Sequence, residues 1–167
     1  FGALIDAARR NLDAVCVLLN GRGCGGNGAQ PPDPGVPAYA LAAGGGFAAR
    51  VAAGRPGAMA DALAAALAHR GFALVDCVGL CPRCGDGDEL ARFTAAAQRA
   101  AGVAHDRASL DAALQRISAE DGGAALGVLY AGAPRPSWEA AEGPAFEQGS
   151  SSALRARATR AEVDARW

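Results

Sequence analysis

The sequence predicts an α/β fold with a mostly parallel sheet flanked by helices. Short apolar runs rich in β-branched residues alternate with longer helical patterns along the chain. The first and third runs lack the polar alternation of a half-exposed strand, which indicates burial on both faces. Polar, Gly-containing loops follow two of these runs, after Leu19 and after Val78. The carboxyl ends of parallel strands lie at such points, and ligands bind there in open α/β sheets.

Composition sets the size and class of the protein. The chain has 167 residues, 51% of them hydrophobic, which is enough for one domain with its own core. A formal net charge of −1 gives no field that would attract nucleic acid or a membrane surface. The sequence contains no membrane-length apolar run, and its first residues lack the pattern of a signal peptide, so we expect none. Its five cysteines are odd in number, so we expect a reducing cytoplasmic location rather than a disulfide framework.

The first half of the chain contains a helix end, two strands and a long loop. Residues 3–11 are typical of a helix that ends in basic residues. The apolar run Ala14–Leu19 predicts a buried strand, and residues 20–37, rich in Gly and Pro, predict a loop. Phe47–Val51 predicts a second, short strand. Because Phe1 lies inside a helical pattern, we expect the parent protein to continue upstream.

The second half repeats the alternation of helix and strand. An Ala-rich helix begins at Pro56, and we expect its buried face at every fourth residue: Met59, Leu63 and Leu67. Phe72–Val78 predicts a third strand, after which come a turn-rich loop and helices over about 89–101 and 107–119. Gly123–Tyr130 predicts the last strand. We therefore expect one domain over residues 1–130 and an extended or partly disordered tail over residues 131–167.

The loop after Leu19 reads LLNGRGCGGNGAQPP and is the first candidate site. Glycine allows the backbone to approach a phosphate closely, and exposed backbone N–H groups bind it. The amide oxygen of an Asn can ligate a hard cation. Gly-rich patterns also occur in flexible surface loops, so both interpretations stay open on these grounds alone.

Four blocks of sequence resemble one protein family, in the order that the family has them. They are AARRNLDAVCVLLNG…GGNGAQ (7–30), AGGGFAARV (43–51), HRGFALVDCVGLCP (69–82) and ALGVLYAGAPRPSWE (125–139). Together they resemble the C-terminal part of the thiamine-diphosphate-binding (beta) subunit of 2-oxoacid:ferredoxin oxidoreductases. The resemblance implies a three-layer thiamine-diphosphate-binding fold that is incomplete at its N-terminus.

The resemblance implies a Mg²⁺–diphosphate site in the loop after Leu19. Asn20 and the carbonyl of Gly23 are the implied Mg²⁺ ligands, although Gly21 stands where the family has its usual side-chain ligand. The family's upstream G-D-G-D motif does not precede the loop, and Gly85–Asp88 spells it in the wrong order, so we interpret that stretch as a turn. The implied diphosphate- and substrate-binding residues are Gly25, Gly26, Asn27, Gly28 and Gln30.

The loop after Val78 contains a second implied site. Cys81 matches the family cysteine that ligates a [4Fe–4S] cluster, whose other ligands would lie outside this chain. We expect Cys77 to be a buried small hydrophobic residue and Cys84 a free surface thiol. Two alternatives are weaker: Cys77, Cys81 and Cys84 spell the C-x3-C-x2-C pattern of radical S-adenosylmethionine enzymes, and the last two spell half a zinc site.

The implied function is oxidative decarboxylation of a 2-oxoacid to an acyl-coenzyme A, with electrons passed to ferredoxin. We expect an alpha subunit as partner and no catalytic side chain, since the cofactor supplies the nucleophile. The first and third blocks favour 2-oxoglutarate slightly over pyruvate. His69, at a predicted helix end, fits the helix dipole rather than catalysis, and His105 fits a solvated surface position. The alternative is a degenerate, non-catalytic α/β subunit with a role in assembly, which Gly21 favours.

Overall fold

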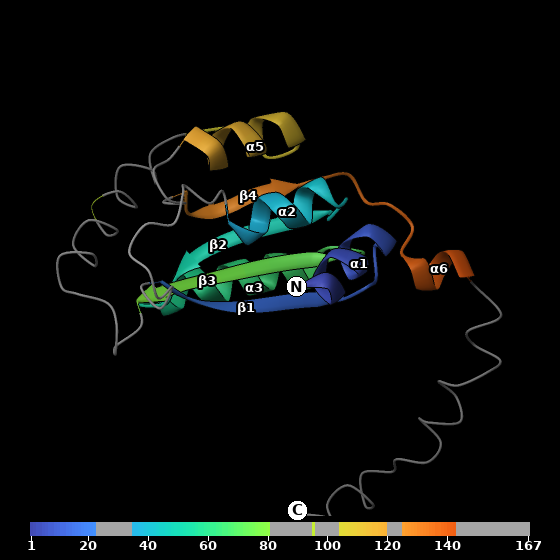
Figure 1. Cartoon of the computed structure of the whole chain (residues 1–167), viewed down its shortest axis with the longest axis horizontal. Helices are drawn as coiled ribbons and strands as arrows, with labels where there is room; N and C mark the ends of the chain where they lie inside the picture. The colour runs from blue at the N-terminus through green and yellow to red at the C-terminus, as the bar shows by residue number, and fades with distance from the viewer. Residues whose placement is uncertain (23–34, 81–94, 96–103, 120–124, 143–167) are drawn as a thin grey trace, which may run out of the picture.

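The computed structural model describes residues 1–22, 35–80, 95, 104–119 and 125–142, and these form one four-stranded sheet with helices on both faces (Figure 1). The strands are β1 (Val15–Arg22), β2 (Phe47–Ala52), β3 (Ala73–Leu80) and β4 (Gly127–Ala131), in the order β1-β3-β2-β4. β3 pairs in parallel with β1 and β2, whereas β4 runs antiparallel to β2. The predicted α/β fold with a mostly parallel sheet is confirmed.

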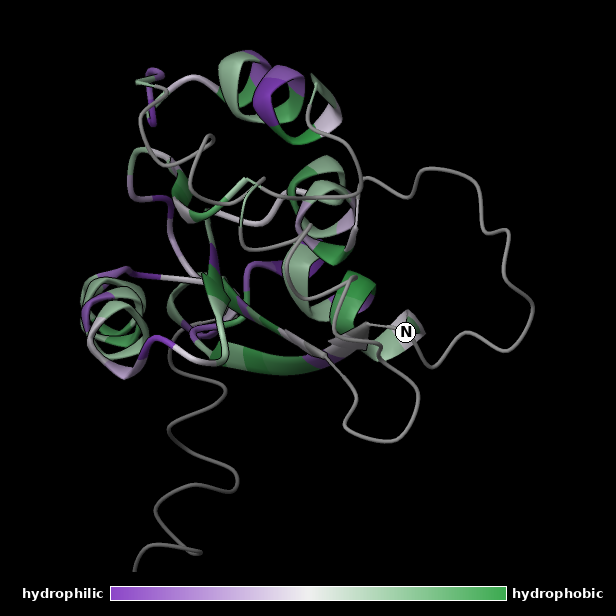
Figure 2. Ribbon diagram, turned by 90° about the vertical axis from the view of Figure 1, so that its left-hand side faces the viewer, coloured by the Kyte–Doolittle hydropathy of each residue, from purple (hydrophilic) through white to green (hydrophobic). Residues whose placement is uncertain are grey.

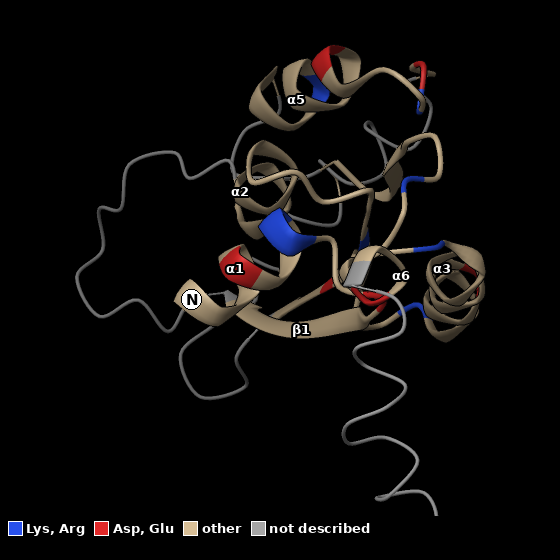
Figure 3. Ribbon diagram, turned by 90° about the vertical axis from the view of Figure 1, so that its right-hand side faces the viewer, with Lys and Arg blue, Asp and Glu red and all other residues tan. Residues whose placement is uncertain are grey.

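Helices cover the sheet from both sides and make three layers. Helix α3 lies on one face, and α1, α2 and α5 lie on the other (Figure 3). The strands between them are coloured mostly as hydrophobic in Figure 2. The described helices are α1 (Gly2–Arg10), α2 (Val36–Ala42), α3 (Pro56–Ala68), α5 (Leu110–Ala119) and α6 (Trp138–Glu142). No helix in the described part of the chain is both long and apolar enough to span a bilayer.

Alternation along the strands separates the core into two layers. Val75 and Cys77, with their neighbours on β2, pack against Ala62 and Ala66 of α3. Leu74, on the other face of β3, packs against α1 and α2, and a further cluster joins β2 and β4 to α5. Because successive side chains of a strand point to opposite faces, β3 contributes to both layers. This explains why its apolar run has almost no polar alternation.

Helix α3 buries small side chains rather than its large ones. Ala62 and Ala66 are 4% and 0% exposed, and Met59 and Leu63 pack beside them only partly buried. The expectation that Leu67 belongs to this face is wrong, since its side chain is 73% exposed. The alanines allow the helix backbone to lie close to the sheet, so the buried stripe follows the small residues and not the leucines.

The observed boundaries differ from the predicted ones by at most two residues for β2 and β3, by three at the end of β1, and by four at the start of β4. Two helices were not predicted. α2 begins directly after Gly35, with Pro37 in its first turn, so the Gly and Pro that predicted a loop are its start signals. α6 lies in the segment predicted to be an extended tail. Residues 143–167 of that predicted tail lie outside the described residues, as do residues 89–94 and 96–101 of a predicted helix.

Strand β1 lies at the end of the strand order, and in the described structure its face on the α3 side is only partly covered. Val17 and Leu19 on this face are 46% and 79% exposed. The prediction that the run Ala14–Leu19 is buried on both faces is therefore wrong, since Cys16 and Leu18 on the other face are only partly buried. α3 lies over β2 and β3, which leaves the end strand beyond its reach.

Candidate functional site at the carboxyl edge of the sheet

The loops that follow β1 and β3 leave the sheet at the same edge. The strand register pairs Asn20 with Val78 and Gly21 with Gly79, so the two parallel neighbours end level with each other. This is the arrangement that the sequence predicted for the two loops. In open α/β sheets, ligands bind outside the carboxyl ends of such strands. We refer to this region as the carboxyl edge.

A buried ion pair lies directly beneath the carboxyl edge. Arg50 of β2 faces Asp76 of β3 in the register, and Arg50 Nε donates to Asp76 Oδ2 at 2.8 Å. The side chains are 2% and 0% exposed, and charged groups are rarely buried this completely unless they are paired. Sequence reasoning missed both residues. The available signal was a single charged residue inside each apolar strand.

Asn20 is hydrogen-bonded to this ion pair. Its Nδ2 donates to Asp76 Oδ1 at 3.3 Å, across the boundary between β1 and β3. An ionised carboxylate only accepts hydrogen bonds, so the amide nitrogen of Asn20 must face Asp76. The amide oxygen, on the other branch of the group, therefore points away from the carboxylate. Asn20, Asp76 and Arg50 form what we call the edge triad.

The start of α2 closes over the edge triad. Gly35 precedes α2 with a φ of 81°, in the left-handed region that favours glycine. A Cβ atom at Gly35 would collide with the guanidinium of Arg50. The backbone can therefore pass this close to the buried arginine only because residue 35 has no side chain.

Cys77 faces away from the edge triad. It is buried in the core cluster under α3, and burial raises the pKa of its thiol, with the Asp76 charge raising it further. The thiol form is therefore favoured over the thiolate that binds iron. This confirms that Cys77 is a buried small hydrophobic residue. It also weighs against the C-x3-C-x2-C interpretation, which would need this thiolate beside a cluster.

Of the predicted site residues, Asn20 is the one that the structure describes. The other predicted site residues lie outside the described residues: Gly23, Gly25, Gly26, Asn27, Gly28, Gln30 and Cys81. Cys84 and the stretch Gly85–Asp88 lie outside them as well. Gly21 is described and exposed, and a Cβ atom added there would meet nothing within 4 Å. The absence of a side chain at residue 21 is therefore not required by the packing of the described residues.

The carboxyl edge offers a donor atom of the type that Mg²⁺ prefers. Mg²⁺ prefers oxygen, and in proteins it is held by one or two protein ligands together with phosphates and water. The amide oxygen of Asn20 is one such ligand. Among the residues with described positions, no three His, Cys, Asp or Glu side chains come close enough to hold a metal. A cation at the carboxyl edge would therefore depend on Asn20 and on groups from the loops.

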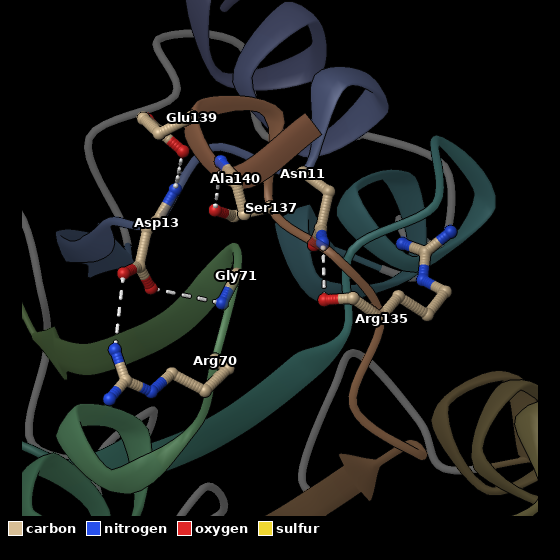
Figure 4. Close-up of polar contacts among 8 residues, drawn as sticks. All are labelled: Asn11, Asp13, Arg70, Gly71, Arg135, Ser137, Glu139 and Ala140. Carbon is tan, nitrogen blue, oxygen red and sulfur yellow. Dashed lines mark hydrogen bonds and ion pairs between the residues drawn. The ribbon is translucent and has the colours of Figure 1, made fainter. Parts of the chain in front are cut away.

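The opposite edge of the sheet is held together by Asn11 (Figure 4). Asn11 lies after α1 with a φ of 55°, and its side chain is nearly buried. Its Nδ2 donates to the carbonyls of Pro136 at 3.0 Å and Arg135 at 3.4 Å, while its Oδ1 accepts from Phe72 N at 3.1 Å. The backbone N–H of Trp138 donates to the Asn11 carbonyl. One residue thus joins α1, β3 and the segment that leads to α6.

Asp13 adds a second set of contacts at this edge (Figure 4). Its carboxylate accepts from Gly71 N at 3.0 Å, and its own N–H donates to Glu139 at 3.0 Å. Arg70 lies 3.7 Å from the same carboxylate, but both groups are exposed, so this pair contributes little. A surface hollow of about 620 Å³ lies here, lined by Asp13, Arg70 and residues 134–137, 139 and 140. We call the contacts of Asn11 and Asp13 the clasp.

The residues that form the clasp come from three of the four family-like blocks. The first block supplies Asn11 and Asp13, the third supplies Gly71 and Phe72, and the fourth supplies the segment that ends at Glu139. These contacts lie where β1 and β3 begin, at the far end from the carboxyl edge. The preference for 2-oxoglutarate over pyruvate stays a prediction, because the first and third blocks both continue to the carboxyl edge beyond the described residues. Part of the resemblance reflects how the fold is held together.

Both described histidines contact other residues of the fold. The His69 ring packs against Phe47 at 5.9 Å between centroids, and burial lowers the pKa of His69, as does nearby Arg135. Burial and Arg135 therefore favour the neutral form of His69 by more than the helix dipole favours the charged form. His105 is half-buried, and its Nε2 lies 2.7 Å from the carbonyl of Leu129 on β4, so the expectation of a solvated residue is wrong.

Comparisons with known proteins give a fold but no family. No protein-family model matches the sequence, and no curated protein matches it. Among solved structures, a chain of 2-oxoglutarate:ferredoxin oxidoreductase from Magnetococcus marinus is similar, with a TM-score of 0.69 and 22% sequence identity. That structure holds 2-oxoglutarate, coenzyme A and succinyl-CoA.

The similarity extends over nearly the whole of this chain. It covers 95% of this chain and 62% of the solved one, so the protein spans less than two thirds of its structural relative. At 22% identity such a likeness establishes the fold, and function has to be argued from the site.

Proposed function

We propose that the chain is the thiamine-diphosphate-binding part of a 2-oxoacid:ferredoxin oxidoreductase, corresponding to its beta subunit. The observation that carries the proposal is the oriented amide of Asn20 at the carboxyl edge, where the family-like loop begins. The fold similarity over 95% of the chain supports it, because a chain of an oxidoreductase of this class shares the arrangement. The order of the four blocks supports it independently.

In this proposal each site residue has a defined task. The amide oxygen of Asn20 and the carbonyl of Gly23 bind Mg²⁺, and the loop residues Gly25–Gln30 bind the diphosphate through backbone N–H groups. Cys81 supplies one thiolate to a [4Fe–4S] cluster. Thiamine diphosphate, when bound, supplies the carbanion chemistry that decarboxylates a 2-oxoacid. The protein contributes binding and orientation, which agrees with the absence of a predicted catalytic side chain.

The proposed substrates and partners follow from the same assignment. They are a 2-oxoacid (2-oxoglutarate or pyruvate), coenzyme A, ferredoxin and an alpha subunit. The solved relative was obtained with 2-oxoglutarate and coenzyme A, which supports a 2-oxoacid and coenzyme A as the substrate classes here. We expect the chain by itself to be inactive, since the remaining cofactor contacts and cluster ligands would come from outside it.

A second candidate function is a degenerate, non-catalytic subunit with a role in assembly. The observation that favours it is Gly21, which has no side chain where the family has its usual ligand and which no described contact requires to be glycine. In that case the fold and the clasp are retained while the cofactor site has decayed.

Calorimetric titration of the purified protein with thiamine diphosphate and Mg²⁺ tests the proposal. We expect a dissociation constant in the micromolar range or below, and no heat of binding when Mg²⁺ is omitted. Gly21→Asn, which has room for its side chain, is the matched variant. If the wild type does not bind and Gly21→Asn does, the degenerate interpretation is correct. If neither binds, the residues of this chain do not hold thiamine diphosphate by themselves, and the proposal in this form is wrong.

A further inference from the structure

A buried ion pair such as that of the edge triad is weak evidence for a contribution to stability. Burial removes the hydration of both charges, and replacing such a pair with apolar groups of similar volume is often neutral or stabilising. Arg50 and Asp76 are almost fully buried in strands that are otherwise apolar. In the register both stand level with Leu18, two residues before Asn20 on β1. Their place beneath the carboxyl edge indicates a role at that edge.

Asp76 determines which way the Asn20 amide faces. Without a partner, the terminal torsion of an Asn side chain is broad, and its oxygen and nitrogen exchange positions easily. Asp76 accepts from Asn20 Nδ2 with Oδ1, while its Oδ2 accepts from Arg50 Nε. Because the carboxylate cannot donate, it selects one of the two amide orientations. The selected orientation turns the amide oxygen away from the buried carboxylate.

We propose that Asp76, held in place by Arg50, is a positioning residue that presents the Asn20 amide oxygen to a divalent cation at the carboxyl edge. The inference rests on the proposed function for the identity of that cation, Mg²⁺. Both oxygens of Asp76 are already engaged within the edge triad, so Asp76 acts through Asn20 and not as a ligand. Such outer partners of metal ligands commonly fix the ligand's orientation.

The first experiment needs no cofactor. Nuclear magnetic resonance of the ¹⁵N-labelled protein reports the order of the Asn20 side-chain NH₂ group, which the variant Asn20→Ala identifies. We expect an ordered group in the wild type and a mobile one in the double variant Arg50→Met/Asp76→Leu. This variant replaces the ion pair with apolar side chains of similar volume, so the fold should be retained. If it does not fold, Arg50→Gln/Asp76→Asn keeps polar side chains at both positions while it removes both charges, and the amide introduced at residue 76, unlike a carboxylate, can also donate and no longer selects one orientation of Asn20.

The second experiment is a thermodynamic cycle with thiamine diphosphate and Mg²⁺ in the calorimeter. Loss of an outer partner of a metal ligand typically weakens binding by about 10- to 100-fold, and we expect a loss in this range for the double variant. Asn20→Ala should weaken binding to a similar degree. Combined with Asn20→Ala, the double substitution should cause no further loss, because Asp76 would have no amide left to orient.

The outcomes separate the inference from the proposed function. If the wild type binds and the double variant binds equally well, or if the losses add, the positioning role is wrong and the proposed function stands. If the wild type does not bind, the proposed function and the cation role both fail, while the resonance experiment still decides whether Asp76 orients Asn20. Leu129→Ala, in a buried position on β4, is the control: it should lower the melting temperature without changing the affinity.

Discussion

At the residue scale, two asparagines with similar chemistry have opposite tasks. Asn11 satisfies both branches of its amide inside the protein and has the left-handed backbone that Asn tolerates well. Asn20 engages its nitrogen with Asp76 in the described structure. The first arrangement stabilises the fold, whereas in the second the amide oxygen is the one that we propose as a cation ligand. The sequence pattern around each residue does not distinguish these roles.

Replacement of Asn11 should separate its hydrogen bonds from its backbone conformation. Asn11→Gly keeps the left-handed φ but loses three side-chain hydrogen bonds, one of them long, and we expect a loss of about 2–3 kcal/mol. Asn11→Ala should lose a further 1 kcal/mol, roughly, since alanine disfavours this conformation. Urea unfolding monitored by circular dichroism measures both. Equal stability of the two variants would contradict the backbone part of the explanation.

His69 predicts a loss of stability in mild acid. Burial and Arg135 lower its pKa in the folded protein, while Asp13 opposes this. A lowered histidine pKa means that the unfolded chain binds the proton more readily. The contribution is therefore fully present above the ordinary pKa of 6.5 and is lost as the pH falls through the folded value.

The measurement for His69 is the urea midpoint between pH 7.5 and pH 5.5, a window chosen above the titration of most carboxylates. We expect the midpoint of the wild type to fall across this window and that of His69→Gln to fall less. An identical slope in both proteins would show that other groups cause the acid sensitivity.

At the scale of elements, helix α3 shows how small residues decide packing. Its buried positions are alanines, while the neighbouring Leu67 is mostly exposed. A helical period identifies a face only when the large apolar residues lie on it. In a chain this rich in alanine, the face that lies against the sheet is the one that allows the closest approach.

Adjacent substitutions in α3 test this description. Ala66→Leu adds volume to a position that is 0% exposed, and we expect a destabilisation of about 1–3 kcal/mol from overpacking. Leu67→Ala removes an exposed side chain and should change the free energy of unfolding by about 0.5 kcal/mol or less. Thermal unfolding of both variants gives the comparison. A larger effect at residue 67 than at residue 66 would mean that the helix is rotated.

At the scale of the whole molecule, the two ends of the parallel strands hold different sets of contacts. The hydrogen bonds of the clasp join the start of β1 and β3 to α6 and to the segment before it. The edge triad lies near the carboxyl ends of the same two strands. Contacts that hold the fold are thus separated from the residues of the proposed cation site. This separation predicts that damage at one end spares the other.

A chain that ends at Ala133 should test the separation. It lacks the partners of Asn11 and Asp13 from Arg135 onward, and we expect it to lose about 2–4 kcal/mol of stability, given a net value near 1 kcal/mol for each hydrogen bond. Its affinity for thiamine diphosphate and Mg²⁺ should remain within about twofold of the affinity of the parent chain. The double substitution Arg50→Met/Asp76→Leu should show the reverse. A truncated chain that is folded but no longer binds would contradict the separation.

The sequence by itself determined the fold class, the approximate positions of the four strands and the edge at which the two loops meet. These are local properties, because apolar runs and turn residues act over a few neighbours. It also predicted Asn20 as a site residue and Cys77 as a core residue. It did not predict α2, because Gly35 and Pro37 are typical of loops and of helix starts alike.

Only the tertiary structure decided which distant residues meet. Asp76 lies 26 residues from Arg50 and 56 from Asn20, and Asn11 lies 125 residues from Pro136. These contacts depend on the strand order β1-β3-β2 and on its register, in which β3 lies between two strands that precede it in the chain. No local pattern encodes that order. It arises because the most apolar strand, β3, buries both faces and pairs its backbone on both sides only in a central position.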